Sequence, residues 1–272
     1  MDAKPWQLQI IDKSLKKKEK LRYLTAGLRL GPADRALDLG CAQGMLSYFL
    51  RRRGGRWASA DQDLVNLRTT QKLVGSTLVR VEPVRLPFLG GRFDLVALPD
   101  YLEHVEDDAG LLREIRRVLK PGGRLIVVVP QTGRFHVLQR LKPALGMRLE
   151  FYGHKREGYS LEGLTAKLAG AGFAPTGHKS YAKFFSEFFE LVLNVLYTKL
   201  MRPPAAAQSE SLRDGHIRPT TAAEFGERRG AFKLYSVVYP FVWLASQLDR
   251  LLFFLEGNSL ILWARARPTI RQ

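Results

Sequence analysis

The segment LDLGCAQG, residues 37–44, decides the fold. It ends a short apolar run and continues into a turn bracketed by Gly40 and Gly44. Glycine has no Cβ, so a backbone that turns there can approach a ligand closely. The next segment, GMLSYFLRRRGG (44–55), predicts a helix closed by glycines. A strand, a glycine-rich turn and a helix together predict a nucleotide-type crevice at the carboxyl end of the strand.

Short apolar runs alternate with helical segments on both sides of this turn. Strands are predicted at 35–40, 56–61, 76–82, 92–100, 124–130, 173–181 and 258–268. Helices are predicted at 64–74, 107–119 and 160–172. Ser160 is a plausible N-cap of the last helix, and KPGG (120–123) predicts a tight turn. Strands that alternate with helices of this length predict an α/β fold with a doubly wound, parallel sheet.

Four segments follow one another in a recognisable order and spacing: LDLGCAQG (37–44), ADQD (60–63), LPFLGGRFDLVALPDYLEHVED (86–107) and LLREIRRVLKPGGRLIVVVP (111–130). This pattern resembles the class I S-adenosylmethionine-dependent methyltransferases, in the subgroup with the motif LPF…FDLV…LEHV…VLKPGG. The resemblance covers about residues 34–181 and, weakly, the last strand. It implies a mostly parallel, seven-stranded Rossmann-like sheet with an antiparallel last strand, and S-adenosyl-L-methionine bound over the first two strands.

The cofactor-binding residues are expected on the loops that follow the strands. Asp61 ends the second strand, where a carboxylate can accept hydrogen bonds from both hydroxyls of a ribose. The resemblance places Glu82 near the adenine amino group, although this residue is one methylene longer than the usual aspartate. Ala42 replaces the usual central glycine of the loop. The full set of residues expected to bind the cofactor is Asp38, Gly40, Gly44, Asp61, Gln62, Glu82, Asp100 and Tyr101.

Methyl transfer from a sulfonium is an in-line displacement, so positioning of donor and acceptor dominates its catalysis. A carbon or hydroxyl acceptor also needs a base, and His104 is the first candidate because imidazole titrates near neutral pH. His104 alternatively only fixes its loop. His154 and Tyr159 are further catalytic candidates, since related enzymes use this region for the acceptor. Glu103 and His104 could ligate a metal, but two residues are too few, and no metal is predicted.

Three regions are expected along the chain. Residues 1–30 predict a basic N-terminal helix, residues 31–181 with 257–272 the cofactor-binding domain, and residues 182–256 an apolar helical insertion. The sixth strand ends at the cofactor edge of a parallel sheet, and an antiparallel seventh strand begins there. The insertion between these two strands is therefore expected to emerge beside the cofactor site.

The insertion contains two apolar helices, which begin near Lys183 and Ala231. The first, KFFSEFFELVLNVLYTKL (183–200), has one narrow polar stripe and is otherwise apolar. The second carries Tyr235, Tyr239 and Trp243, residues that favour a water–lipid boundary. The helices form either a hydrophobic lid or an element lying in a membrane surface, and the second alternative is favoured. Basic residues bracket them and suit anionic lipid: Lys179, Lys183, Lys199, Arg202, Arg228, Arg229 and Lys233.

Composition narrows the function classes. The chain has 43 Lys and Arg against 26 Asp and Glu, a formal charge of +17, which attracts anionic partners. The single cysteine, Cys41, excludes an intramolecular disulfide, and neither a signal peptide nor an uncharged apolar run of about 18 residues is present. We expect a cytoplasmic protein, peripheral on the inner face of the membrane.

The sequence favours methyl transfer to a lipid-like or membrane-associated acceptor: an isoprenoid or quinone precursor, a glycolipid or a phospholipid. A methyltransferase for nucleic acid or a polar small molecule is the first alternative, although the insertion lacks the interleaved aromatic and basic residues of a stacking platform. A non-catalytic membrane subunit that binds S-adenosylmethionine is the second alternative. The acceptor atom and the oligomeric state are left open.

Overall fold

Seven strands form one sheet in the computed structural model of the chain, in the order β3-β2-β1-β4-β5-β7-β6. The structure describes residues 4–75, 77–133, 153–200 and 229–268, and the single positions 138, 141, 142, 145, 149, 225 and 226, without the side chains of 194, 197–200 and 231. The strands are β1 (Leu30–Leu39), β2 (Gly54–Asp61), β3 (Leu78–Arg80), β4 (Phe93–Pro99), β5 (Leu119–Pro130), β6 (Phe173–Tyr181) and β7 (Ser259–Ala266). β7 runs antiparallel to β5 and β6, and the other pairs are parallel. The predicted mostly parallel, doubly wound sheet is confirmed.

Helices connect the strands at the predicted places. They are α1 (Trp6–Asp12), α2 (Leu15–Thr25), α3 (Met45–Arg51), α4 (Leu64–Val74), α5 (Asp108–Val118), α8 (Leu161–Gly170), α9 (Phe184–Leu200) and α11 (Arg229–Ser246), with 3₁₀ turns η1 (Leu102–His104) and η4 (Gln247–Arg250). Side chains cap several of them, because the first N–H groups of a helix lack partners within it. Asp63 accepts from Val65 N at 2.6 Å, Asp107 accepts from Gly110 N at 2.7 Å, and the predicted cap Ser160 accepts from Gly163 N at 3.1 Å.

The N-terminal segment forms two helices where the sequence predicted one. Ser14 has an extended backbone (φ −113°, ψ 119°), and its hydroxyl accepts a hydrogen bond from Lys17 N at 3.3 Å. A serine that caps a helix in this way ends the preceding one, so α1 and α2 are separate.

The KPGG segment also differs from its predicted role as a separate turn. Residue Phe93 of β4 pairs with Leu119 of β5, but Leu95 pairs with Arg124, so four residues of β5 loop out between the two pairs. Gly122 has φ +74° there, a conformation that glycine adopts at low cost. The segment is therefore an irregularity inside β5 and lies between paired residues of the same strand.

Alternate residues of the central strands face two separate cores. Leu37, Val96 and Val127 belong to the core that packs under α5 and α8. On the opposite face, Ala36 and Val128 belong to the core that includes residues of α2 and α3. Side chains alternate along a strand, so this division places helices on both faces of the sheet.

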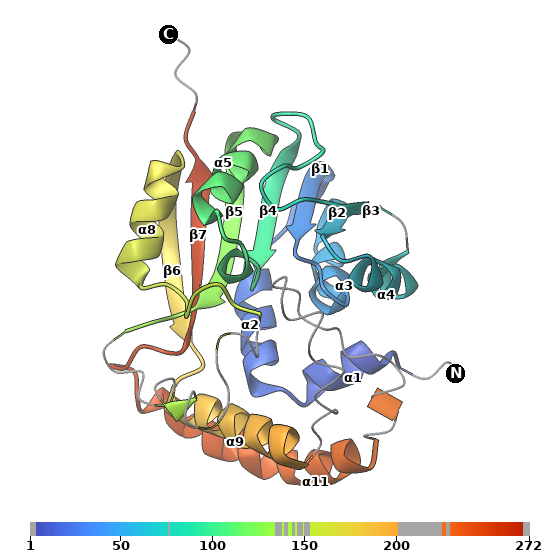
Figure 1. Ribbon diagram of the computed structural model, residues 1–272, viewed down its shortest axis with the longest axis vertical. Coiled ribbons are helices and arrows are strands. Elements are labelled where there is room, and N and C mark those ends of the chain that lie inside the picture. Colours follow the sequence, from blue (N-terminus) through green and yellow to red (C-terminus); the bar gives the residue numbers. More distant parts are fainter. Residues whose placement is uncertain are drawn as a thin grey trace.

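The carboxyl ends of the parallel strands point toward α2, and α9 and α11 lie side by side beyond it (Figure 1). Glu187 of α9 is buried and pairs with Lys16 of α2 at 3.3 Å and with Lys142 at 2.5 Å. These two cations hold the pKa of the Glu187 carboxyl at about 2, in spite of the opposing effect of burial. Among the described residues, no helix combines the length and apolar character needed to cross a bilayer.

Candidate functional site

The loop after β1 is shaped by three residues in left-handed conformations. Gly40, Ala42 and Gly44 have φ values of 82°, 46° and 80°. A Cβ on Gly40 would lie 2.5 Å from a ring carbon of Tyr101, and one on Gly44 would lie 2.9 Å from Thr70. Both predicted glycines are therefore required by close packing as well as by backbone conformation. Ala42, which stands where the family has glycine, adopts a conformation that is costly for alanine.

Asp61, the last residue of β2, accepts hydrogen bonds from this loop and from the start of α4. Its Oδ2 accepts a hydrogen bond from Ala42 N at 2.8 Å, and its Oδ1 accepts from Asp63 N at 2.9 Å and from Asn66 Nδ2 at 3.1 Å. Burial raises the pKa of the Asp61 carboxyl, although these three bonds favour the charged form. Each oxygen already serves donors of this chain, and the predicted contact with a ribose would use its remaining lone pairs.

Two buried polar atoms near the loop have no hydrogen-bond partner in the part of the chain that the structure describes. They are Oδ1 of Asp38 and the hydroxyl of Tyr101. Asp38 is fully buried and its other oxygen accepts from the Ser47 hydroxyl; burial raises its pKa to about 6. Buried polar groups are rarely left unpaired, so these atoms fit a ligand that brings hydrogen-bonding groups of its own. S-adenosylmethionine, with an ammonium and hydroxyl groups, satisfies this requirement.

Two further predicted cofactor residues, Gln62 and Glu82, follow the ends of β2 and β3. The Gln62 carbonyl accepts a hydrogen bond from Arg80 Nε at 3.2 Å. Glu82 is exposed after β3, and its carbonyl accepts from Arg85 N at 3.1 Å. The contacts of Gln62 and Glu82 with the cofactor stay predictions.

Asp100 brings the N-terminal helix into the site. It ends β4 in a left-handed conformation (φ 49°), and its carboxylate pairs with Lys20 of α2. Burial, assisted by repulsion from two neighbouring lysines, lowers the pKa of Lys20 to about 7. Lys20 is not among the site residues predicted from the sequence. One signal was present: Lys20 lies four residues before the buried Leu24, on the same helix face.

Glu103, His104 and His154 form a second cluster of polar groups beside Lys20. One possible ligand atom from each residue lies within 4.8 Å of the others. The two imidazole rings pack edge to face, with their centroids 4.7 Å apart. Burial raises the pKa of Glu103 to about 7 and lowers the pKa of both histidines, that of His154 to about 3. The sequence alone offers two of these groups for a metal, and the structure adds His154 as a third donor. Nitrogen and oxygen donors of this kind suit a divalent transition metal.

His104 is oriented by the loop that carries His154. Its Nδ1 lies 2.9 Å from the Gly153 carbonyl oxygen. A carbonyl only accepts, so Nδ1 carries the proton in this hydrogen bond, and Nε2 of the neutral ring is the free base.

Tyr159 occupies a different position from the two histidines. Its ring belongs to the core under α5, and its hydroxyl donates to Asp108 at 2.8 Å. Burial and this carboxylate raise the pKa of Tyr159. Asp108 also pairs with Arg156 and Lys167, so Tyr159 ties its loop to the start of α5. A catalytic role for Tyr159 stays a prediction.

Comparison with known proteins agrees with this geometry. Residues 37–127 match the family model described as "Methyltransferase domain". The chain is 37% identical over 114 residues to a ubiquinone biosynthesis O-methyltransferase of Xanthomonas oryzae pv. oryzae, which covers 40% of this chain and 47% of the relative. It is 34% identical over 111 residues to a demethylmenaquinone methyltransferase of Mycobacterium marinum. This match covers 39% of this chain and 46% of the relative. The chain therefore spans about half the length of these curated relatives.

Solved structures share the fold at low sequence identity. Geranyl diphosphate C-methyltransferase from Streptomyces coelicolor superposes with a TM-score of 0.56 at 14% identity, covering 92% of this chain and 77% of that one. The [4+2]-cyclase SpnF superposes with a TM-score of 0.58 at 19% identity, covering 93% of this chain and 82% of that one. Residues 37–127 therefore form a methyltransferase domain, and the fold that the resemblance in the sequence implies is confirmed.

Proposed function

We propose that the protein transfers a methyl group from S-adenosylmethionine to a lipid-like acceptor of the quinone-precursor class, at an anionic membrane surface. The names of the relatives from Xanthomonas and Mycobacterium support an acceptor of this class. Because the chain spans about half of each relative, the names alone do not carry the proposal. The exposed apolar face of α9 and α11 carries it.

Apolar side chains project from both helices at helical spacing. On α9 they follow one another every fourth residue and are 39–48% exposed: Phe184, Phe188, Val192 and Leu196. On α11 and η4 they follow at steps of three and four and are 44–72% exposed: Leu234, Val237, Phe241, Leu244 and Leu248. A hydrophobic lid would bury such stripes. Contiguous exposed apolar faces mark interaction surfaces, and an amphipathic helix with aromatic residues lies well in a lipid interface.

Charge supports an anionic bilayer as the partner of this face. Lys233 and Arg229 are exposed near the start of α11, and the whole chain carries a formal +17. Basic residues near a membrane surface each contribute about 1 kcal/mol of attraction to anionic lipid. Apolar burial and charge attraction would act together on the same face of the protein.

The polar groups at the ends of β4 and η1 would serve the chemistry. S-adenosylmethionine supplies the electrophilic methyl group when it is bound. The Gly40 loop and the Tyr101 ring would hold the cofactor, and burial would keep water from the reacting atoms. His104 would accept the proton of a hydroxyl acceptor at Nε2, since burial lowers its pKa and keeps the ring neutral at pH 7.

A pair of matched variants tests the membrane part of the proposal. Phe241 is 72% exposed on α11, and Leu89 is 78% exposed on the loop before β4. We expect Phe241→Asp to reduce binding to vesicles of phosphatidylcholine with phosphatidylglycerol at least tenfold. Leu89→Asp also replaces an exposed apolar side chain by a carboxylate, away from the helices, and should bind like the wild type. Equal binding of all three proteins would refute the membrane contact.

The chemistry is tested separately, with methyl-labelled cofactor and the full chain. We expect label in an isoprenoid phenol or quinol presented in the same vesicles. We also expect Phe241→Asp to retain transfer to a short-chain, water-dispersed analogue. Label in RNA or in polar metabolites, with none in the lipid, would favour the alternative acceptor class. Cofactor binding without transfer to any of these acceptors would favour a non-catalytic role.

A further inference from the structure

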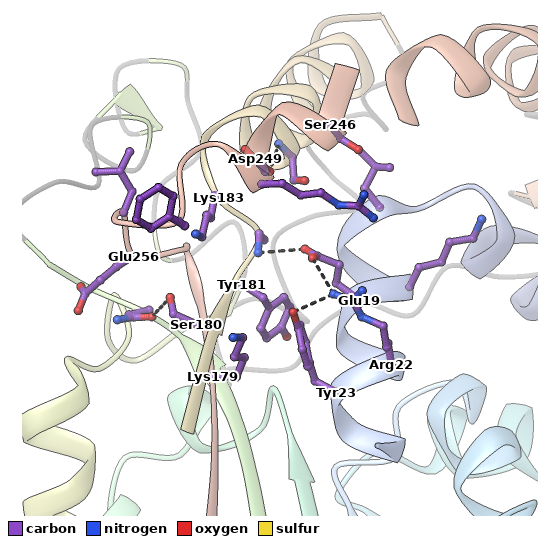
Figure 2. Close-up of a pocket in the computed structure, with 18 of the residues that line it drawn as sticks. Glu19, Arg22, Tyr23, Lys179, Ser180, Tyr181, Lys183, Ser246, Asp249 and Glu256 are labelled. Carbon is purple, nitrogen blue, oxygen red and sulfur yellow. Dashed lines mark hydrogen bonds and ion pairs between the residues drawn. The ribbon is translucent and has the colours of Figure 1, made fainter. Parts of the chain in front are cut away.

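A cavity of about 730 Å³ lies between α2, the end of β6, η4 and residues 251–256 (Figure 2). Its volume is typical of small-molecule sites. The residues of the cofactor loop do not line it. Glu19 and Arg22 of α2 line the cavity, whereas Lys20 of the same helix pairs with Asp100 at the end of β4. The helix α2 therefore contributes to both sites, and the cavity is lined by other residues than the cofactor loop.

The charge of the lining favours an anion. Five cations face three carboxylates around the cavity: Lys18, Arg22, Lys179, Lys183 and Arg250 against Glu19, Asp249 and Glu256. Two of the carboxylates already accept backbone hydrogen bonds. Glu19 accepts from Ala182 N at 3.1 Å, and Asp249 accepts from the N–H groups of Phe185 and Ser186 at 2.7 and 3.0 Å. Their negative charge stabilises the start of α9, and the lining keeps an excess of positive charge.

Among the described residues, three of the cations pair with no carboxylate, and one of them, Lys18, lies over the ring of Tyr239 with its Nζ 4.8 Å from the ring centroid. Within the described part of the chain, Lys18, Lys179 and Arg250 form no ion pair, and they come from α2, β6 and η4. In Figure 2 the labelled side chains of α2 and β6, together with Asp249 of η4, surround the same space. Cations converging from three elements suit a phosphate group, which accepts several charge-assisted hydrogen bonds at once.

Three exposed aromatic residues also line the cavity, and one of them, Trp243, belongs to α11. Trp243, Phe253 and Phe254 belong to its lining and are 48%, 82% and 69% exposed. Aromatic rings in such positions favour the boundary between lipid and water. A ligand that satisfies both the cations and these rings has an anionic head and an apolar chain.

We propose that this cavity binds the phosphate-bearing head group of an anionic phospholipid, whose acyl chains lie over Trp243, Phe253 and Phe254. The site is separate from the acceptor site and selects the lipid on which the protein docks. The proposal rests on the membrane location given under the proposed function, and it is independent of methyl transfer.

The test uses the full chain and a water-soluble probe, dihexanoyl-phosphatidylglycerol below its micelle concentration, measured by calorimetry. The double variant Lys179→Gln/Arg250→Gln removes two cations of the cavity. Each charge-assisted hydrogen bond contributes about 1.5–3 kcal/mol, so we expect affinity to fall tenfold or more. The control Arg56→Gln/Lys72→Gln removes two exposed cations of β2 and α4 and should bind within twofold of the wild type. Equal losses in both variants would show attraction by net charge alone and would overturn the proposal.

Two further probes separate the sources of the phosphate. Inorganic phosphate should bind at least tenfold more weakly than the phospholipid, and equal affinity would overturn the part assigned to the aromatic residues. Dihexanoyl-phosphatidylcholine, whose head group has no net charge, should also bind more weakly. Methyl transfer to a water-dispersed acceptor should be the same in the Lys179/Arg250 variant as in the wild type. If the variant keeps its lipid affinity while the wild type transfers methyl groups, this site fails and the proposed enzyme stands. If the variant loses lipid affinity while the wild type transfers no methyl group, the proposed enzyme fails and this site stands.

Discussion

The contact between Gly40 and Tyr101 gives the most direct test of the cofactor loop. Replacing Gly40 by alanine places a Cβ 2.5 Å from Cδ2 and 2.7 Å from Cβ and Cγ of Tyr101. Carbon atoms of neighbouring side chains pack at about 3.5–4.0 Å, so the ring or the loop must move by roughly 1 Å. Both form the wall of the proposed cofactor site, so the movement affects stability and binding together.

Two effects set the size of the loss. The left-handed conformation of residue 40 (φ 82°) costs alanine about 1–2 kcal/mol. Overpacking against the ring adds about 1–3 kcal/mol. We therefore expect Gly40→Ala to lower the free energy of unfolding by about 2–5 kcal/mol, a large part of the stability of an ordinary domain.

Gly91 provides a matched control for the backbone effect. It also has a positive φ, of 63°, but a Cβ added there would meet no atom within 4 Å. Gly91→Ala should therefore lose only the conformational part, about 1–2 kcal/mol. Urea unfolding of both variants measures the difference, provided that the slope of the transition stays the same. The rise in melting temperature on adding S-adenosylmethionine should shrink in Gly40→Ala and persist in Gly91→Ala.

A double-mutant cycle assigns the remaining loss to the ring. If overlap with Tyr101 is the cause, Gly40→Ala should cost about 1–3 kcal/mol less in a Tyr101→Ala background than in the wild type. Additive losses, or a Gly40→Ala variant as stable as Gly91→Ala, would refute the packing of Tyr101 on the loop.

Variants at three other positions test single contacts. Glu187→Gln should lower stability at pH 7 by an amount on the order of 3 kcal/mol, because the folded-state pKa of Glu187 is about 2 against an ordinary 4.5. The difference from the wild type should shrink in acid unfolding as the pH falls from 4.5 toward 2; a difference independent of pH would contradict the ion pairs. Ser160→Ala should cost about 1 kcal/mol through loss of the N-cap of α8, and Ser160→Gly less. Ser47→Ala removes the hydrogen bond that favours ionised Asp38, so its cofactor affinity should fall below that of the wild type at pH 6.5 and recover at pH 8.5. An affinity that does not change with pH would exclude a role for the Asp38 charge.

The sheet could be predicted from the sequence because its signals are local. An apolar run such as 124–130 and the helix at 64–74 are each defined by their own residues, and the structure places β5 and α4 there. The N-cap Ser160 was found in the same way, since its partner lies three residues away. For KPGG the sequence predicts the turn but not its place inside β5. That place depends on β4, which pairs with the residues on both sides of the turn.

The sequence predicts the polar groups of the candidate site singly, and it does not predict which residues they contact. Asp100 and Lys20 lie 80 residues apart in the chain, and His104 lies 49 residues from the carbonyl that orients it. No local period links such residues. Burial then decides their chemistry, because it lowers the pKa of Lys20 to about 7, where its charge depends on physiological pH.

The position of the inserted helices is likewise only partly predictable from the sequence, because it depends on contacts between elements that are far apart in the chain. Strand order predicts that a segment between β6 and β7 emerges at the carboxyl edge of the parallel strands, and α9 begins there, three residues after β6 ends. Strand order does not predict that α2 packs on that edge, held by Lys20 on Asp100 and by Glu19 on the N–H of Ala182. The basic N-terminal helix α2 thus lies between the apolar helices and the cofactor loop (Figure 1). An acceptor entering from the face of α9 and α11 must pass α2, so the contacts of Lys20 and Glu19 bear on access to the cofactor as much as on stability.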